Sequence, residues 1–277
     1  MPDPSTLRDL VDLVAVLRGP EGCPWDREQT ATSIRSYLVE EAHELAAALD
    51  AQGWDEIRQE LGDVLFQVAF VARLAEEAGV FRAEDVVAWQ HRKMVERHPH
   101  VFGDESLPDA EAVAAAWERR KVEGSNRGAL DGVPDSLPAL VGAYRLTQKA
   151  AGVGFDWEDA TGPRRKIAEE LAELDEETTA SPADPRRLDE EMGDLLFAVA
   201  NLSRHLGIDP EAALSRANRK FRRRFAAIER RLREQGRAPA DATLEEMDTL
   251  WNEAKEAEGV AARAADDGAP SPEGSPR

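Results

Sequence analysis

Hydrophobic residues along the chain recur at intervals of three and four positions, which is the period of one face of an α-helix. The pattern is clear in residues 38–49, 61–72 and 221–232. Clusters of glycine and proline separate such segments, and no run alternates apolar and polar residues as a half-buried strand would. We therefore predict an all-α fold in which each helix buries one apolar stripe in a bundle.

The chain also repeats itself. Residues 60–73 (ELGDVLFQVAFVAR) and 191–204 (EMGDLLFAVANLSR) are identical at eight of fourteen positions without a gap, and the segments around them follow in the same order. Such self-similarity predicts two copies of one unit with about four or five helices each. We predict an N-terminal repeat at 1–124, a linker at 125–137, a C-terminal repeat at 138–258 and a disordered tail at 259–277.

Composition narrows the possible functions. The 277 residues include 55 acidic and 35 basic side chains, giving a net charge of −20 that repels a phosphate backbone. Nine lysines and arginines lie within residues 216–233, but we expect most of them to be solvated, so stable nucleic-acid binding is not predicted. A single cysteine, Cys23, excludes a disulfide framework. With no secretory pattern and no apolar run of about 18 residues, we expect a cytoplasmic protein that does not enter membranes.

Acidic residues lie on the predicted core side of two neighbouring helices in each repeat. Carboxylates three residues apart share a helix face, and a short loop makes the two helices antiparallel neighbours. Four close carboxylates raise one another's pKa, which a divalent cation relieves, and all-oxygen ligands favour Mg²⁺, with Mn²⁺ as the other option. The predicted ligands are Glu41, Glu44, Glu60 and Asp63 in the first repeat, and Glu170, Glu173, Glu191 and Asp194 in the second.

Two other interpretations of these residues are weaker. Solvated charges explain a single ExxE motif, but they fit poorly with ExxE followed by ExxD twice in one chain. Glu40 and His43 form the Glu-x-x-His pair of di-iron bundles, but the second repeat has Ala172 in place of the histidine.

Basic and aromatic residues recur in pairs four positions apart. A lysine and an arginine on one helix face can act together on one phosphate group, and a tryptophan one turn from a lysine can form an aromatic wall near a base. A tryptophan that anchors its helix to the core is the alternative, and the sequence leaves it open. The pairs are Lys93 and Arg97, Trp117 and Lys121, Lys220 and Arg224, and Trp251 and Lys255.

These motifs resemble those of a known family, the all-α nucleoside triphosphate pyrophosphohydrolases. The segment 40–44 followed by Glu60-x-x-Asp63 is similar to the family's EExxE…ExxD signature, and the second repeat matches it too. The duplication resembles the two-repeat, MazG-type members, as do the segments CPWD (23–26), HPHVF (98–102) and GFDW (154–157). The resemblance covers about residues 5–258.

The resemblance implies magnesium-dependent hydrolysis of ribo- and deoxyribonucleoside triphosphates to the monophosphate and pyrophosphate. It implies that the acidic positions bind the metals and that the first glutamate of EExxE, Glu40 or Glu169, supports the metals or the attacking water. It also implies a homodimer whose C-terminal repeat provides most of the activity and grips the nucleotide through Lys220, Arg224, Trp251 and Lys255. Here both repeats keep the acidic set, but they differ at Phe70 and Asn201.

The sequence leaves two alternative functions open. A non-catalytic helical module that binds a regulatory partner predicts an exposed apolar groove and gives no reason for carboxylates on the core side. A narrow-specificity enzyme acting on dUTP, dCTP or phosphoribosyl-ATP is the other, although such relatives usually have one unit per chain.

Overall fold

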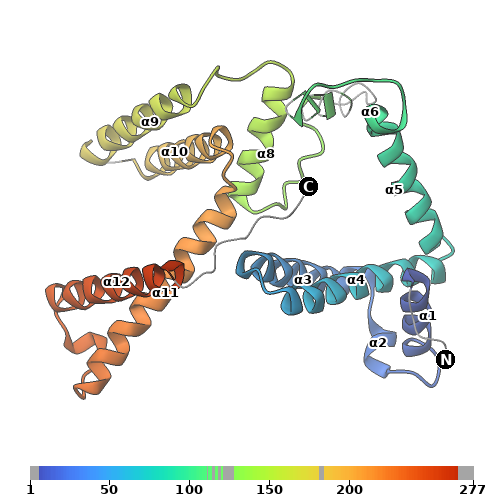
Figure 1. Ribbon diagram of the computed structural model, residues 1–277, viewed down its shortest axis with the longest axis horizontal. Coiled ribbons are helices and arrows are strands. Elements are labelled where there is room, and N and C mark those ends of the chain that lie inside the picture. The colour runs from blue at the N-terminus through green and yellow to red at the C-terminus, as the bar shows by residue number, and fades with distance from the viewer. Residues whose placement is uncertain are drawn as a thin grey trace. The chain divides into compact units, whose positions relative to one another are not determined.

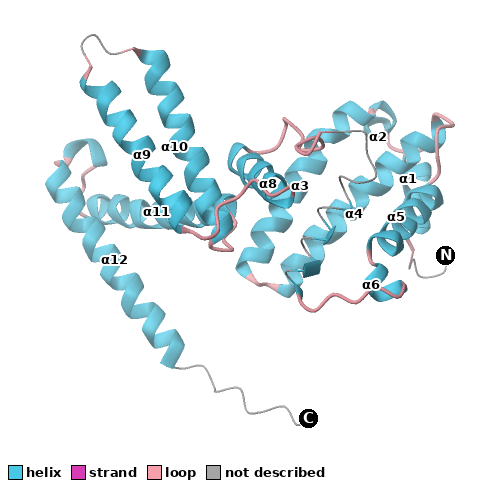
Figure 2. Cartoon of the chain, turned by 90° about the horizontal axis from the view of Figure 1, so that it is seen from above, coloured by secondary structure: helices cyan, strands magenta, loops and turns pink. Residues whose placement is uncertain are grey.

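The computed structural model describes residues 6–110, 112–113, 116–117, 120, 128–180 and 184–267. Helices form the architecture, and the described residues include no strand (Figures 1 and 2), so the predicted all-α fold is confirmed. The chain divides into two compact units, Met1–Asn126 and Arg127–Arg277, at a point inside the predicted linker. Among the described helices, none has both the length and the apolar character needed to cross a bilayer.

Unit 1 is built around a long antiparallel helix pair, α3 and α4, which a two-residue turn connects. Gln52 in this turn has a left-handed backbone with φ of 58°, which ends α3 abruptly. The described helices of this unit are α1 (Leu7–Leu17), α2 (Pro24–Glu28), α3 (Ala31–Ala51), α4 (Trp54–Glu77), α5 (Ala83–Arg97) and α6 (Pro99–Phe102).

The core of unit 1 lies where α1 packs against the C-terminal half of α4. Alanines at 69 and 72 on α4 are small enough to let α1 approach closely, and Val11 of α1 packs against them. Phe70 is completely buried beside Val14 and Ile34. The C-terminal half of α4 is thereby fixed, whereas the half that faces α3 bears the acidic residues.

Glu76 connects three helices of unit 1. Its carboxylate accepts hydrogen bonds from Nη1 and Nη2 of Arg8 at 2.5 and 3.0 Å and from the backbone N–H of Ala83, at the start of α5, at 3.3 Å. The hydrogen bonds from Arg8 lower the pKa of Glu76 more than its burial raises it. The ionised pair therefore stabilises the fold above the ordinary glutamate pKa.

Replacing this carboxylate should weaken the fold in a pH-dependent way. We expect Glu76→Gln to lower the free energy of unfolding by about 1 kcal/mol at pH 7, because the charged hydrogen bonds are lost. Since folding lowers the pKa of Glu76, its contribution is full above about pH 4.5 and is lost as the pH falls through the folded-state pKa. Urea unfolding of the wild-type protein and of Glu76→Gln from pH 7 to pH 3 measures whether their free energies of unfolding become equal at low pH. The exposed Glu96→Gln serves as the control, and equal losses in the two variants would contradict the assignment.

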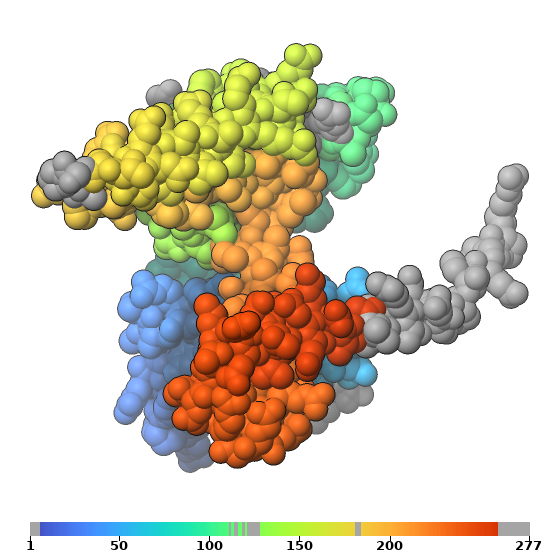
Figure 3. Space-filling view, turned by 90° about the vertical axis from the view of Figure 1, so that its left-hand side faces the viewer, coloured from blue at the N-terminus to red at the C-terminus, as the bar shows by residue number. Residues whose placement is uncertain are grey.

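Unit 2 repeats the antiparallel pair as α9 and α10, and α8 packs against α10. A second helix pair, α11 and α12, follows it, and Figures 1 and 3 show the two pairs lying apart within the unit. The described helices are α8 (Ala139–Gly152), α9 (Thr161–Thr179), α10 (Pro185–His205), α11 (Pro210–Glu234) and α12 (Leu244–Asp267), with a 3₁₀ helix at Pro239–Asp241.

The end of α12 differs from the prediction. We predicted a disordered tail from residue 259, but the helix extends to Asp267. Four alanines in residues 259–267 explain the difference, because alanine has the highest intrinsic helix propensity even where large apolar residues are missing. Residues 268–277 of the predicted tail lie outside the described residues.

Candidate functional site

Three carboxylates converge between α9 and α10. Glu170 comes from α9, whereas Glu191 and Asp194 lie three residues apart on one face of α10. Each offers an oxygen atom that lies within 4.8 Å of the other two. Glu170 and Glu191 are only 2% and 7% exposed, and Asp194 is exposed. Burial of like charges at this distance costs free energy unless cations compensate.

The surroundings of Glu170 show that compensation is incomplete. Its Oε1 atom lies 2.5 Å from Nζ of Lys166, but its Oε2 atom is buried with no hydrogen-bond partner among the described residues. An unpartnered buried carboxylate oxygen is costly. A cation that binds this oxygen would remove the cost, so the donor set fits a metal.

Sequence reasoning missed two cations beside this cluster. Lys166 also donates to Glu169 at 2.7 Å, and Arg187 lies 3.2 Å from Glu191. Each cation precedes its buried glutamate by four residues, and that helical spacing is the signal that could have revealed them. The fourth predicted ligand, Glu173, is exposed. Partial desolvation of its carboxylate, followed by the charges of Glu170 and Glu191, raises its pKa.

Unit 1 repeats the geometry with less charge compensation. Oxygens of Glu41 on α3 and of Glu60 and Asp63 on α4 lie within 4.8 Å of one another. Burial, followed by neighbouring carboxylates, raises the pKa of Glu41 and of Glu60, and a hydrogen bond with the exposed Glu44 also raises that of Glu60. No ion pair among the described residues neutralises these carboxylates, so this cluster also fits a cation.

The donor chemistry selects the kind of metal. Each cluster offers only carboxylate oxygens, which suit hard divalent cations such as Mg²⁺ and Mn²⁺. His43 is exposed and belongs to neither cluster, so the di-iron alternative lacks its histidine ligand. Glu40 and Glu169, the predicted catalytic glutamates, are exposed on α3 and α9, one residue before the half-buried Glu41 and the buried Glu170.

The predicted nucleotide-binding residues of unit 2 assemble on α11 and α12. The guanidinium of Arg224 lies 5.4 Å from the centroid of the Trp251 ring, and Arg224 donates to Glu258 at 2.9 Å. Lys220 and Lys255 are exposed on the same helix pair. Because the α11–α12 pair lies apart from the α9–α10 pair (Figure 3), the structure does not bring these four residues to the carboxylates of unit 2.

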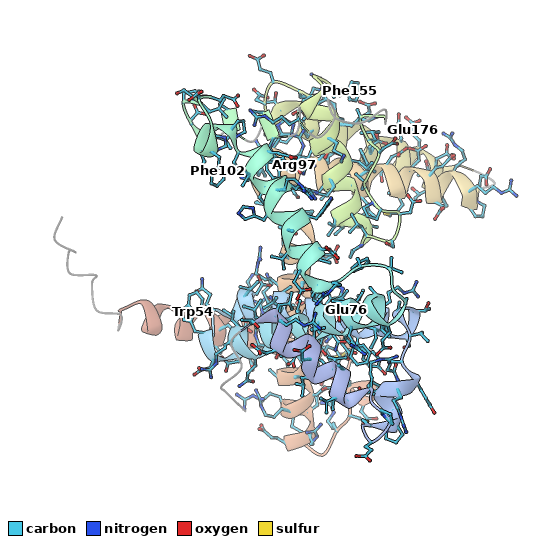
Figure 4. The ribbon with its side chains drawn as sticks, turned by 90° about the vertical axis from the view of Figure 1, so that its right-hand side faces the viewer. Trp54, Glu76, Arg97, Phe102, Phe155 and Glu176 are labelled. Carbon is cyan, nitrogen blue, oxygen red and sulfur yellow. The ribbon has the colours of Figure 1, made fainter. Side chains whose placement is uncertain are left out.

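The corresponding residues of unit 1 are only partly described. The guanidinium of Arg97 lies 5.2 Å from the centroid of the Trp117 ring, and Lys93 lies over Trp89 at 4.5 Å. Arg97 lies on α5, well away from the α3–α4 turn marked by Trp54 (Figure 4). Lys121 lies outside the described residues.

Fold and site together define an all-α protein with a tandem pair of acidic sites, each between two antiparallel helices. The chain matches the MazG nucleotide pyrophosphohydrolase domain over residues 29–102 and again over residues 162–227. The two matches contain the two carboxylate clusters. The chain belongs to the MazG family.

Curated relatives cover most of the chain. It is 44% identical to the "Nucleoside triphosphate pyrophosphohydrolase/pyrophosphatase MazG" of Thermotoga maritima, over 89% of this chain and 94% of that protein. It is 43% identical to the "Nucleoside triphosphate pyrophosphohydrolase" of Escherichia coli K12, over 90% of this chain and 97% of that protein. It is also 46% identical to the "Uncharacterized protein YabN" of Bacillus subtilis, over 92% of this chain and 52% of that protein.

The carboxylate cluster of unit 2 should bind a divalent cation, and this binding should depend on Asp194 but not on an exposed carboxylate elsewhere on the same helix. We expect Asp194→Asn to lower the affinity for Mn²⁺ at least tenfold at one class of site, because the substitution removes one charged ligand. A Mn²⁺ titration followed by electron paramagnetic resonance measures this affinity. Asp189→Asn, an exposed position on α10 outside the cluster, is the matched control. Unchanged Mn²⁺ binding in Asp194→Asn would exclude this site.

Proposed function

We propose that this MazG-family enzyme hydrolyses ribo- and deoxyribonucleoside triphosphates to the nucleoside monophosphate and pyrophosphate. The observation that supports this most directly is the convergence of Glu170, Glu191 and Asp194, with one buried oxygen of Glu170 that has no hydrogen-bond partner among the described residues. The printed names of the Thermotoga and Escherichia relatives support nucleoside triphosphates as the substrate class. Broad base specificity and action in the cytoplasm are part of the proposal.

The proposed cofactor is Mg²⁺, with Mn²⁺ as a substitute. When bound, the cation would polarise a phosphoryl oxygen and lower the pKa of a bound water. The proposed ligands in unit 2 are Glu170, Glu173, Glu191 and Asp194, and those in unit 1 are Glu41, Glu44, Glu60 and Asp63. The partly buried position of both clusters supports this assignment, because a low dielectric strengthens the attraction between carboxylates and a cation.

The proposed catalytic residues are Glu169 in unit 2 and Glu40 in unit 1. Each carboxylate is exposed to solvent next to its cluster, where it can orient a water and accept its proton. The water oxygen forms a new bond to phosphorus, the bond between the α- and β-phosphoryl groups breaks, and pyrophosphate leaves. The hydrogen bond from Lys166 at 2.7 Å supports the role of Glu169, because it holds the carboxylate in place.

We propose a homodimer in which Lys220, Arg224, Trp251 and Lys255 of one copy serve the carboxylates of the other. The separation of the two helix pairs within unit 2 supports this arrangement, and so do their exposed apolar side chains. These exposed residues are Leu171 on α9, Met192, Leu196 and Val199 on α10, and Leu214 and Phe221 on α11. In unit 1 the same role is proposed for Lys93, Arg97, Trp117 and Lys121.

Removing a proposed metal ligand should strongly reduce catalysis in its own unit. We expect Glu191→Ala to lower the contribution of unit 2 to pyrophosphate release by on the order of 10²-fold, because the cation that would balance the charge of the phosphates loses a ligand. Glu60→Ala tests unit 1, and the double variant shows whether both units work. Glu190→Ala, an exposed neighbour on α10, should retain activity. Undiminished hydrolysis in the double variant would refute the assignment.

If two copies of the chain share a site, two differently defective chains should restore activity to each other in a mixed dimer. We expect Asp194→Ala and Arg224→Ala chains each to be weakly active and, when co-expressed with different tags and purified as the mixed dimer, to exceed the sum of the two. One mixed dimer then contains one site with an intact carboxylate set and an intact Arg224. Activity equal to the sum would place Arg224 in the site of its own chain.

A further inference from the structure

A cavity of about 280 Å³ lies in unit 2 between the loop that joins α8 to α9 and the C-terminal half of α10. Phe155 and Trp157, in the loop between α8 and α9, form part of its wall, and Phe197 and Asn201 of α10 line it from the other side. Figure 4 shows Phe155 near the start of α9, and Glu176 farther along that helix. The volume is just below the usual range for ligand pockets, about 300–1,000 Å³, and suits a ring system better than a whole nucleotide.

The cavity and the carboxylates share one face of α10. Phe197 follows Asp194 by three residues and Asn201 follows Phe197 by four, which are the two spacings that keep side chains on one stripe. At 1.5 Å per residue, Asn201 lies roughly 10 Å along the helix from Asp194. One extended ligand can therefore reach both places.

The two repeats differ at a position that lines this cavity. Unit 1 has Phe70 where unit 2 has Asn201, and Phe70 fills its core completely, with the guanidinium of Arg18 5.5 Å from its ring centroid. Asparagine is smaller and polar, so it leaves space and adds hydrogen-bonding groups. A residue chosen for stability alone would be apolar, as in unit 1.

Asn201 presents a hydrogen-bond donor of fixed orientation. Arg204 donates to Oδ1 of Asn201 from Nε at 3.1 Å and from Nη2 at 2.9 Å. Because a guanidinium only donates, the amide oxygen must face Arg204 and the amide nitrogen must face away. No hydrogen bond of the described residues uses those amide N–H groups. They are thus available to an acceptor in the cavity that Asn201 lines.

Further contacts hold this donor and the Trp157 ring in place. Asp156 accepts from Arg204 at 2.9 and 2.5 Å, and burial opposes the ionisation of Asp156, but these hydrogen bonds keep its pKa below the ordinary value. Gly162 packs against Trp157 so closely that a Cβ at residue 162 would overlap the indole ring. The amide donor of Asn201 and the Trp157 ring are therefore preorganised, which lowers the cost of binding.

We propose that this cavity binds the heterocyclic base of the nucleoside triphosphate whose phosphates lie at the unit 2 carboxylates, an inference that rests on the proposed function. Phe155, Trp157 and Phe197 supply the aromatic surfaces on which a planar base packs. The amide N–H of Asn201 donates to a carbonyl oxygen or ring nitrogen at the base edge. The stripe along α10 sets the separation between base and phosphates.

Filling the cavity tests this proposal. Asn201→Phe introduces the residue that unit 1 accommodates at the same position, and Asn201→Asp removes the donor with little change in shape. In the full-length protein with unit 1 disabled by Glu60→Ala, we expect Asn201→Phe to raise KM for nucleoside triphosphates at least tenfold, with kcat within threefold of the Glu60→Ala parent. Inhibition by inorganic tripolyphosphate, which has no base, should stay unchanged. Asn201→Asp should raise KM by different factors for the four bases.

Nucleoside binding separates this proposal from the proposed function. Adenosine, guanosine, cytidine and uridine are titrated against the full-length protein, and we expect at least one to quench the fluorescence of Trp157, as defined by the difference from Trp157→Phe. Asn201→Phe should abolish this quenching, and Asn218→Phe, the same exchange at an exposed position on α11, should not.

The outcomes are distinct. Nucleoside quenching that depends on Asn201, in a protein that hydrolyses no triphosphate, would support the pocket and overturn the proposed function. Hydrolysis with KM and quenching unaffected by Asn201→Phe would leave the function intact and overturn the pocket. Loss of quenching with equal loss of tripolyphosphate inhibition and of the thermal transition in both Asn201 variants would assign Asn201 a structural role and overturn the pocket as well.

Discussion

Repulsion between carboxylates on neighbouring helices is the constraint on which the rest of the structure depends. The α9–α10 pair packs through a face that includes Glu170, Glu191 and Asp194, so the contacts that form the unit also bring three negative charges together. Packing buries Glu170 and Glu191, so these two charges cannot separate without breaking the pair. A site that is unfavourable when empty gains the most from a bound cation, which links the stability of the unit to its ligand.

The two repeats balance this repulsion differently. In unit 2, Lys166 and Arg187 contact Glu170 and Glu191, so part of the negative charge is neutralised within the chain. In unit 1 the ionisation of Glu41 is disfavoured instead, and its pKa rises. The same backbone therefore presents one site with cations already at its edge and another that depends on protonation or on external cations.

Helix spacing predicted the helices and the three converging carboxylates of each unit, because both follow from residues three or four apart. It could not show that Glu44 and Glu173 stay exposed at the edge of their clusters, since that depends on how far two helices cross. Nor could it place Lys220 and Arg224, because sequence order does not reveal whether α11 turns back towards α9. The difference between Phe70 and Asn201 was visible in the sequence, but the cavity was not, because a void depends on every neighbouring side chain.

Comparison of the two repeats shows what the second repeat gives up in packing at this helix position. Replacing a buried phenylalanine by a small residue typically costs about 3–5 kcal/mol, and Phe70 shows how the same helix position is filled when stability alone decides. In unit 2 the charged hydrogen bonds that join Asp156, Arg204 and Asn201 offset part of that cost, since such bonds are stronger than neutral ones. The network therefore does two things at once: it stabilises the walls of a cavity that packing leaves open, and it fixes the direction of the one amide donor inside it.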